Sequence, residues 1–200
     1  MGRMKNPAIS NPFPFLALVF VLLIAPASAG EPPTGFRSLR WGASVEEAKK
    51  VFPNAKCLSS KGKRGESDSG DASCLIETTI GSAKVKVLLE FFEKPTTPKS
   101  ARGFQSYAIT YKSKDFSEIR EALSTRYGNP ATTNEEPIQT RSGLKDTNTI
   151  LLWKLETCSI QAMTYAGSIL EGMASVSTKS WTQEFERRRK ARSGESGKDL

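Results

Sequence analysis

Few residues in this chain could do chemistry, and histidine is not among them. The 200 residues include 29 Lys and Arg, 21 Asp and Glu, and no His. Histidine is the commonest general base and a frequent metal ligand, so its absence excludes a Ser-His-Asp or Cys-His mechanism and a His-based zinc site. The three Cys residues also lack a C-x-x-C pair. An enzyme of this sequence would rely on carboxylates, Lys, Ser or Cys alone.

The spacing of Ser60 and Lys63 matches the S-x-x-K motif of penicillin-recognising enzymes. In that motif the Ser stands at the start of a helix, so that the Lys one turn later can assist the nucleophile. Here the tetrad lies in a stretch rich in Gly, Ser, Lys and Asp, from 59 to 72, and the companion S-D-N and K-T-G motifs are missing. We therefore interpret this stretch as an exposed loop.

Carboxylates in two places could serve a metal or a hydrolase. Glu66, Asp68 and Asp71 offer oxygen ligands in the same loop, but a calcium loop closes with a Glu at position twelve, and the twelfth residue from Asp68 is a Thr. Glu90 and Glu93 stand near the end of an expected strand, with no spacing that demands catalysis. The sequence predicts no catalytic residue, no metal site and no cofactor.

The first 29 residues have the three parts of an export signal. Two basic residues form the n-region, an unbroken apolar run spans 15–25, and an A-S-A cleavage site ends at Ala29. The run is shorter than the roughly 20 residues of a spanning helix, which favours a cleaved signal over an anchor. We expect a mature chain that begins at Gly30, is periplasmic or secreted and soluble, and keeps no transmembrane span.

The composition of this mature chain suits one domain or two small ones. A hydrophobic content of 38% with 8% aromatics is enough for a core. Loss of the two n-region cations lowers the net charge from +8 to +6, a mild surplus that is concentrated in the tail at 187–192.

The cysteines are Cys57, Cys74 and Cys158, and an exported protein meets an oxidising compartment. Sequence alone leaves three pairings open, as well as three reduced core residues. A Cys57–Cys74 bridge closes the shortest loop and is favoured, with Cys158 buried and free.

Three helices are expected. Ser44 and Glu47 have the spacing of a capping box, and Asp115 with Glu118 repeats it. A Pro ends the first helix, and Gly-Asn-Pro ends the second. Residues 181–192 are expected to form the third.

A hairpin is the clearest β signal. Strands at 73–80 and 83–93 flank a two-residue Gly-Ser turn, in a register that sets Glu77 opposite Lys86. Further strands are expected at 104–112, 132–140, 148–155, 158–165 and 173–178.

The coarse element order is helix, four strands, helix, four strands, helix, with ranges assigned to three strands of the first half and to all four of the second. This predicts an α+β fold with antiparallel sheet and helices packed on one face. It also suggests two tandem α-plus-four-strand modules, at 30–114 and 115–180, followed by a C-terminal helix and basic tail at 181–200. Side-chain identity between the halves is poor, so chance similarity of element order stays an alternative.

Short motifs carry a resemblance. Residues 36–50 (FRSLRWGASVEEAKK) resemble the opening of exported bacterial α+β proteins with an aromatic-Gly-x-Ser capping segment, and LSTRYGNP followed by LLWKLETCSI resembles their second half. The helix that ends in Gly-x-Pro before a Trp-bearing hairpin is similar to the small lipoprotein subunit of the outer-membrane protein assembly machine. Tandem units of this kind resemble the secreted β-lactamase-inhibitor-like fold. That lipoprotein carries a Cys after its cleavage site, whereas Gly30 stands here, so no lipid anchor is implied.

Basic and aromatic residues are the remaining candidates for binding. The run 187–192 is interpreted as a solvated face, with contact to an anionic surface as the alternative, and its compartment argues against nucleic acid. Trp41 and Trp153 are expected in the core. Trp181 with Phe185 is expected to dock the last helix on the body.

These observations together favour an exported, non-enzymatic envelope protein. It would act as a protein-binding or assembly-accessory module that engages an envelope partner through its sheet face or loops. The alternatives are a carrier or sensor of a small apolar ligand between helices and sheet, and a histidine-free hydrolase. Partner identity and oligomeric state are left open.

Overall fold

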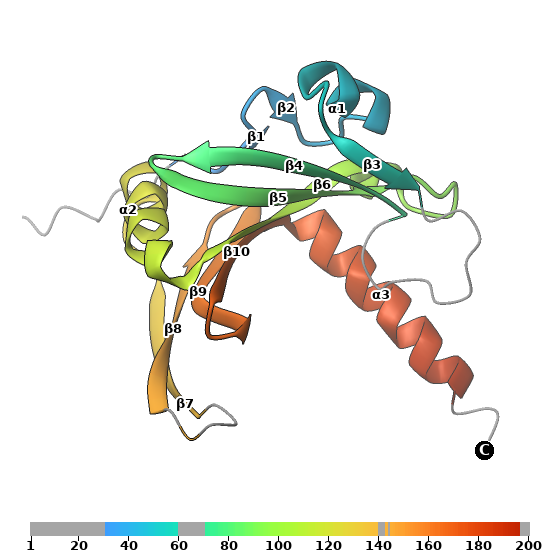
Figure 1. Ribbon diagram of the computed structural model, residues 1–200. Coiled ribbons are helices and arrows are strands. Elements are labelled where there is room, and N and C mark those ends of the chain that lie inside the picture. The colour runs from blue at the N-terminus through green and yellow to red at the C-terminus, as the bar shows by residue number, and fades with distance from the viewer. Residues whose placement is uncertain (1–30, 60–70, 140–142, 144, 197–200) are drawn as a thin grey trace, which may run out of the picture.

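Eight antiparallel strands form one sheet in the computed structural model, which describes residues 31–59, 71–139, 143 and 145–196 (Figure 1). The strand order is β3-β4-β5-β6-β10-β9-β8-β7. A small hairpin and three helices accompany the sheet, so the α+β prediction is confirmed. The strands are β1 (Gly35–Phe36), β2 (Leu39–Arg40), β3 (Lys56–Ser59), β4 (Ala72–Ile80), β5 (Ala83–Phe92), β6 (Gly103–Lys112), β7 (Thr132–Gln139), β8 (Lys145–Lys154), β9 (Cys158–Ser168) and β10 (Glu171–Thr178). The helices are α1 (Val45–Val51), α2 (Phe116–Tyr127) and α3 (Lys179–Ser196).

The two halves of the chain meet in the middle of this sheet. Strands β3 to β6 form one meander and β7 to β10 form the other, and the last strands of the two, β6 and β10, pair with each other. The expected order of helix, four strands, helix, four strands and helix is present after the β1–β2 hairpin, which was not expected. The division at 114/115 and an origin by duplication stay predictions.

The side of the sheet toward α1 and α2 is the core. Because facing residues of antiparallel strands lie side by side, the register groups the core side chains into rows that cross the sheet. One row is Ile76, Val87, Ile109, Ala174, Ala162 and Leu151, and the next is Cys74, Leu89, Tyr107, Val176, Ile160 and Trp153. All twelve side chains are buried.

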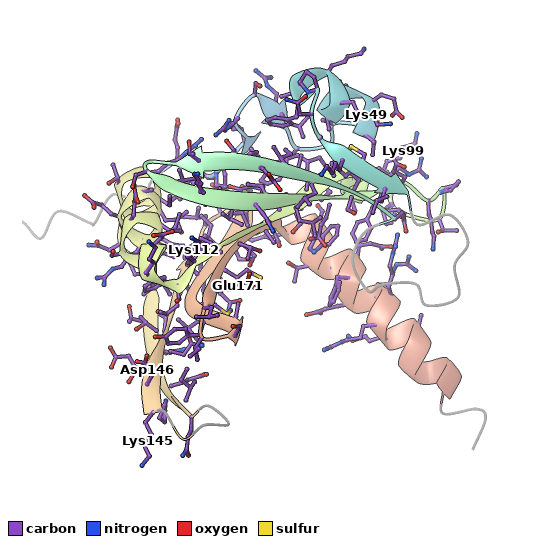
Figure 2. The ribbon with its side chains drawn as sticks, in the orientation of Figure 1. Lys49, Lys99, Lys112, Lys145, Asp146 and Glu171 are labelled. Carbon is purple, nitrogen blue, oxygen red and sulfur yellow. A yellow bond between two sulfur atoms is a disulfide. The ribbon has the colours of Figure 1, made fainter. Side chains whose placement is uncertain are left out.

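Helix α1 begins as predicted. Ser44 is extended, with ψ at 167°, and its hydroxyl accepts a hydrogen bond from the Glu47 amide, while the Glu47 carboxylate accepts one from the Ser44 amide. Val45 and Ala48 bury the inner side of the helix against the sheet. The capping box therefore orients a two-turn helix whose lysines point to solvent, as Lys49 does (Figure 2).

The predicted capping box of α2 is wrong. Asp115 closes a short 3-10 turn (Ser113–Asp115) with ψ at 4°, and its side chain makes no cap hydrogen bond. Glu118 instead accepts hydrogen bonds from the amide and hydroxyl of Ser82, in the turn between β4 and β5. The Glu118 carboxylate thus binds Ser82, 36 residues earlier in the chain, and not the backbone at the start of α2.

This contact explains the Gly that begins the turn. Gly81 has a φ of +57°, and a Cβ there would collide with Oε1 of Glu118. We expect Gly81→Ala to lower the free energy of unfolding by the about 1–2 kcal/mol that a left-handed non-Gly residue costs, with a further loss from displacing the Glu118 carboxylate off Ser82. Urea unfolding measures this loss, and Gly167→Ala, at a φ of +75° with no neighbour near its Cβ, is the matched control. Equal losses in the two variants would contradict a role for the Glu118 contact.

Helix α3 leaves the sheet on the side away from α1 and the β1–β2 hairpin (Figure 1). In the described part of the chain, no helix has both the length and the apolarity needed to cross a membrane.

Candidate functional site

The residues singled out for chemistry do not come together in a catalytic or metal site among those described. Ser60, Lys63, Glu66 and Asp68, like the expected cleavage point at Ala29 and Gly30, lie outside the described residues. Within the described residues, no group of three or more His, Cys, Asp or Glu side chains is placed to hold a metal ion.

The favoured disulfide is present. Cys57 and Cys74 are bonded, directly opposite each other on β3 and β4. Cys158 is free and buried, as expected. Burial raises the pKa of the Cys158 thiol to about 11, which keeps it protonated at neutral pH.

Glu90 and Glu93 lie in different surroundings. Burial raises the pKa of Glu90, against the opposing effect of a hydrogen bond with Ser106. The Glu93 side chain is exposed, and its backbone amide donates to the carboxylate of Asp71. The two residues are therefore distinct: one carboxyl on the sheet face and one on the surface.

Asp71 is buried rather than solvated, which sequence reasoning missed. Its Oδ2 accepts hydrogen bonds from the amides of Glu93 and Lys94, at 2.9 and 2.8 Å. Its Oδ1 lies 2.7 Å from Nη1 of Arg188, in the run that was interpreted as a solvated face. Arg188 is thus an internal cation that joins α3 to the end of β5.

Further contacts surround the Arg188 guanidinium. Its Nε donates to Oε1 of the buried Glu184 at 2.7 Å, and its Nη2 donates to the buried Thr97 hydroxyl. The guanidinium also lies 4.2 Å from the centre of the Phe92 ring. We call Arg188, Asp71, Glu184, Thr97 and Phe92 the α3 anchor.

The charges of this anchor shift the pKa values of its carboxyl groups. Burial alone would raise the pKa of Asp71, but hydrogen bonds from Arg188 and from the two backbone amides outweigh it, and the pKa is lowered. A hydrogen bond from Arg187 lowers the pKa of Glu184 against burial, and Arg188 adds to this effect. Both carboxyl groups are therefore ionised at neutral pH.

The three tryptophans pack as expected. Trp153 is buried and its indole donates to the Gly128 carbonyl, while Trp41 stacks against Tyr107 and donates to the Pro33 carbonyl. Trp181 stacks on Phe92 with ring centres 4.1 Å apart, next to the α3 anchor. Trp181 therefore docks the last helix on the body of the protein.

The side of the sheet opposite the core is bordered by α3 and faces away from α1 and α2, and we call it the open face. The register again groups its side chains into rows. The leucine row is Leu75, Leu88, Ala108, Ser175, Gln161 and Leu152, all half-buried. The charged row is Glu77, Lys86, Thr110, Met173, Met163 and Ile150. The serine row is Ser73, Glu90, Ser106, Ser177, Ser159 and Lys154.

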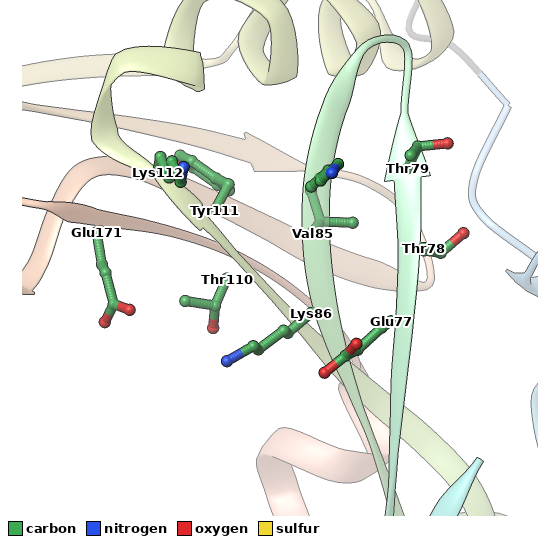
Figure 3. Close-up of a pocket in the computed structure, with 10 residues that line it drawn as sticks. Glu77, Thr78, Thr79, Val85, Lys86, Thr110, Tyr111, Lys112 and Glu171 are labelled. Atoms are coloured by element: carbon green, nitrogen blue, oxygen red, sulfur yellow. The ribbon is translucent and has the colours of Figure 1, made fainter. Parts of the chain in front are cut away.

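Two hollows lie on the open face. The larger, of about 500 Å³, is at the end of the charged row, where Lys86, Thr110, Glu77 and Glu171 point to the same side of the strands (Figure 3). Lys112 of β6 and Glu171 of β10, both labelled in Figure 2, line this hollow where the two halves of the sheet pair. The smaller, of about 280 Å³, lies between the leucine and serine rows and α3.

Helix α3 supplies one wall of the smaller hollow. Trp181, Thr182 and Phe185 line it from the helix, and serines and Gln161 line it from the strands. The α3 anchor therefore also determines the shape of the open face, because α3 keeps this wall only while it is docked.

The geometry defines the class: an α+β protein with an eight-strand antiparallel sheet, covered by helices on one face and largely open on the other. The chain matches no protein-family model, no curated protein and no solved structure. Its function is therefore inferred from its own surface chemistry.

Proposed function

We propose that this chain is an exported, non-enzymatic envelope protein that binds a protein partner through the open face. The observation that carries the proposal is the leucine row. Leu75, Leu88 and Leu152 are only half-buried on this face, and Leu152 lies in the hollow that α3 borders. Exposed apolar side chains within a polar surround are typical of protein-binding surfaces.

The charges of the open face favour a partner with an acidic surface. Lys84, Lys86 and Lys112 line the larger hollow against two glutamates, and Lys154 is the one charged residue of the smaller hollow. Complementary charge speeds encounter and fixes orientation, while the apolar row supplies affinity. Ser, Thr, Gln and Met side chains make up most of the uncharged rest of the rows, and they adapt to a partner by hydrogen bonding and by flexible packing.

Export supports the proposal from the other direction. The signal-like segment is the reason to propose export, and a disulfide on an edge strand is consistent with an oxidising compartment. The mass of the mature product checks export, since cleavage leaves an amino terminus at Gly30.

Site-specific photocrosslinking tests the binding surface. A photoreactive benzoylphenylalanine at Gln161, in the leucine row, is expected to capture one reproducible envelope protein when the full chain is expressed in its own host. The same residue at Lys49, on α1, is expected not to capture it (Figure 2). Capture of the same protein from both positions, or from neither, would overturn the proposal.

A pair of matched variants measures the contribution of the leucine row. Leu88→Ser with Leu152→Ser is expected to reduce the Gln161 crosslink at least about tenfold, as loss of central apolar contacts does. Val51→Ser shortens a half-buried aliphatic side chain on α1 and should leave the crosslink unchanged. Circular dichroism confirms that each variant is folded before the crosslinks are compared.

A further inference from the structure

A separate pocket lies on the core side of the sheet, away from the open face. It has a volume of about 280 Å³ and lies between the β1–β2 hairpin and α2, above β4 and β6. We call it the hairpin pocket. Its apolar wall is Phe36, Ile80, Ile109, Ile119, Ala122 and Leu123.

The hairpin pocket contains two cations and no anion. Arg37, from the turn between β1 and β2, and Arg126, from the last turn of α2, both line it, and no Asp or Glu does. In the part of the chain that the structure describes, neither guanidinium is paired with a carboxylate. Arg37 donates only to neutral oxygens, the Thr78 hydroxyl and the Thr79 carbonyl.

The backbone conformation of Arg37 is also unusual. Its φ of +54° makes it the one non-Gly residue in the left-handed region among those described. Such a residue costs about 1–2 kcal/mol, and Gly would avoid the cost. The turn thus holds an arginine at the wall of an apolar pocket in a position where the backbone alone favours Gly.

At the other side, Arg126 lies next to two tyrosines of the pocket. Its guanidinium is 5.4 Å from the centre of the Tyr127 ring, and Tyr127 is hydrogen-bonded to Tyr107. Arginine forms paired hydrogen bonds with carboxylates, so an anion at this position would gain a charged partner.

The volume limits the size of the ligand. A water molecule occupies about 30 Å³ in the liquid. If each non-hydrogen atom of a ligand takes the same volume, the pocket holds about nine of them. An apolar wall with a cationic rim and this capacity matches a short fatty carboxylate. From these contacts we propose that the hairpin pocket binds a monocarboxylate with an apolar chain of about eight carbons.

Octanoate is the probe that tests this proposal on the mature, disulfide-bonded chain. Titration followed by nuclear magnetic resonance is expected to show saturable binding at one site, with shifts confined to the β1–β2 hairpin, α2 and the ends of β4 and β6. Octanol, with the same chain and no charge, is expected to bind at least about tenfold more weakly, because it forms no ion pair.

Two variants of α2 separate charge recognition from structure. Arg126→Gln should weaken octanoate binding about tenfold and leave octanol binding unchanged. Arg120→Gln removes an exposed cation from the same helix, outside the pocket, and should change neither. Equal affinity for octanoate and octanol, an insensitive Arg126→Gln, or no saturable binding up to about 5 mM would overturn the proposal.

The octanoate titration tests the hairpin pocket independently of the proposed partner-binding function. The hairpin pocket and the leucine row lie on opposite sides of the sheet and share no residue. A failed octanoate titration would leave the Gln161 crosslink as it is, and the reverse holds as well.

Discussion

Arg188→Ala is expected to undock α3 from the sheet, with a loss of about 3 kcal/mol. Removing one partner of a buried ion pair costs about 3–5 kcal/mol, because the remaining charge is left buried and unpaired. Here Asp71 and Glu184, which are 8% and 3% exposed, lose Arg188 but each keeps a second cation: Lys94 lies 3.7 Å from Asp71, and Arg187 lies 2.7 Å from Glu184. We take the lower end of the range of about 3–5 kcal/mol because the Arg188 side chain is not fully buried: it is 16% exposed.

Hydrogen exchange measures this undocking directly. A loss of about 3 kcal/mol corresponds to exchange about a hundredfold faster for the amides of the first turns of α3. Arg189→Ala is the matched control. Arg189 is the next residue in the helix and its side chain is exposed, and substitutions of exposed residues change the free energy of unfolding by no more than about 0.5 kcal/mol. Arg188→Lys keeps the charge but not the planar fork, and should fall between the two. Unchanged exchange in Arg188→Ala would contradict the α3 anchor.

Acid should weaken the same anchor. The pKa of Asp71 is lowered in the folded protein, so the pairing with Arg188 contributes its full stability above the ordinary value of 3.8 and loses it as the pH falls through the lower folded value. Glu184 acts in the same direction from its ordinary value of 4.5. The protection of the α3 amides, which is the intrinsic exchange rate at each pH divided by the measured rate, should therefore fall below about pH 4 in the native chain, and much less in Arg188→Ala.

Reduction of the disulfide is expected to lower the free energy of unfolding by about 3 kcal/mol. The bond joins residues 17 apart, and closing a loop of that length removes about this much from the entropy of the unfolded chain. Urea unfolding with and without dithiothreitol measures the difference. The third thiol, Cys158, is buried and protonated only in the folded chain, so both measurements are made in a Cys158→Ala background.

The double variant Cys57→Ala with Cys74→Ala supplies the control. Its urea midpoint should lie near that of the reduced native chain, and dithiothreitol should not change it. Mass spectrometry establishes that the native bond is reduced in the test sample. A native chain whose urea midpoint stays the same after full reduction would show that the bond contributes no stability.

The elements predicted best are those whose partners lie close along the chain. The Gly81-Ser82 turn and alternating side chains gave the β4–β5 register, with Glu77 opposite Lys86. The Ser44–Glu47 capping box formed for the same reason, because both partners lie within one turn. Local chemistry of this kind needs no knowledge of the rest of the fold.

The predictions that failed involve partners far along the chain. Asp115 and Glu118 repeat the spacing of Ser44 and Glu47, but the carboxylate finds Ser82 across the fold. Arg188 looks like its basic neighbours in sequence, and only its distance to Asp71, 117 residues earlier, sets it apart. The short strands β1, β2 and β3 have too few residues for a periodic signal.

The pairing of β6 with β10 has a consequence for how the chain reaches its fold. Ser106 meets Ser177 across this seam, so the sheet is incomplete until nearly the whole chain is available. Until then β6 presents an unpaired edge in the first meander, and such edges pair readily with other chains. A chain that ends before Glu171 should therefore aggregate, and only synthesis of the last strand allows the eight-strand sheet to close over the edge of β6.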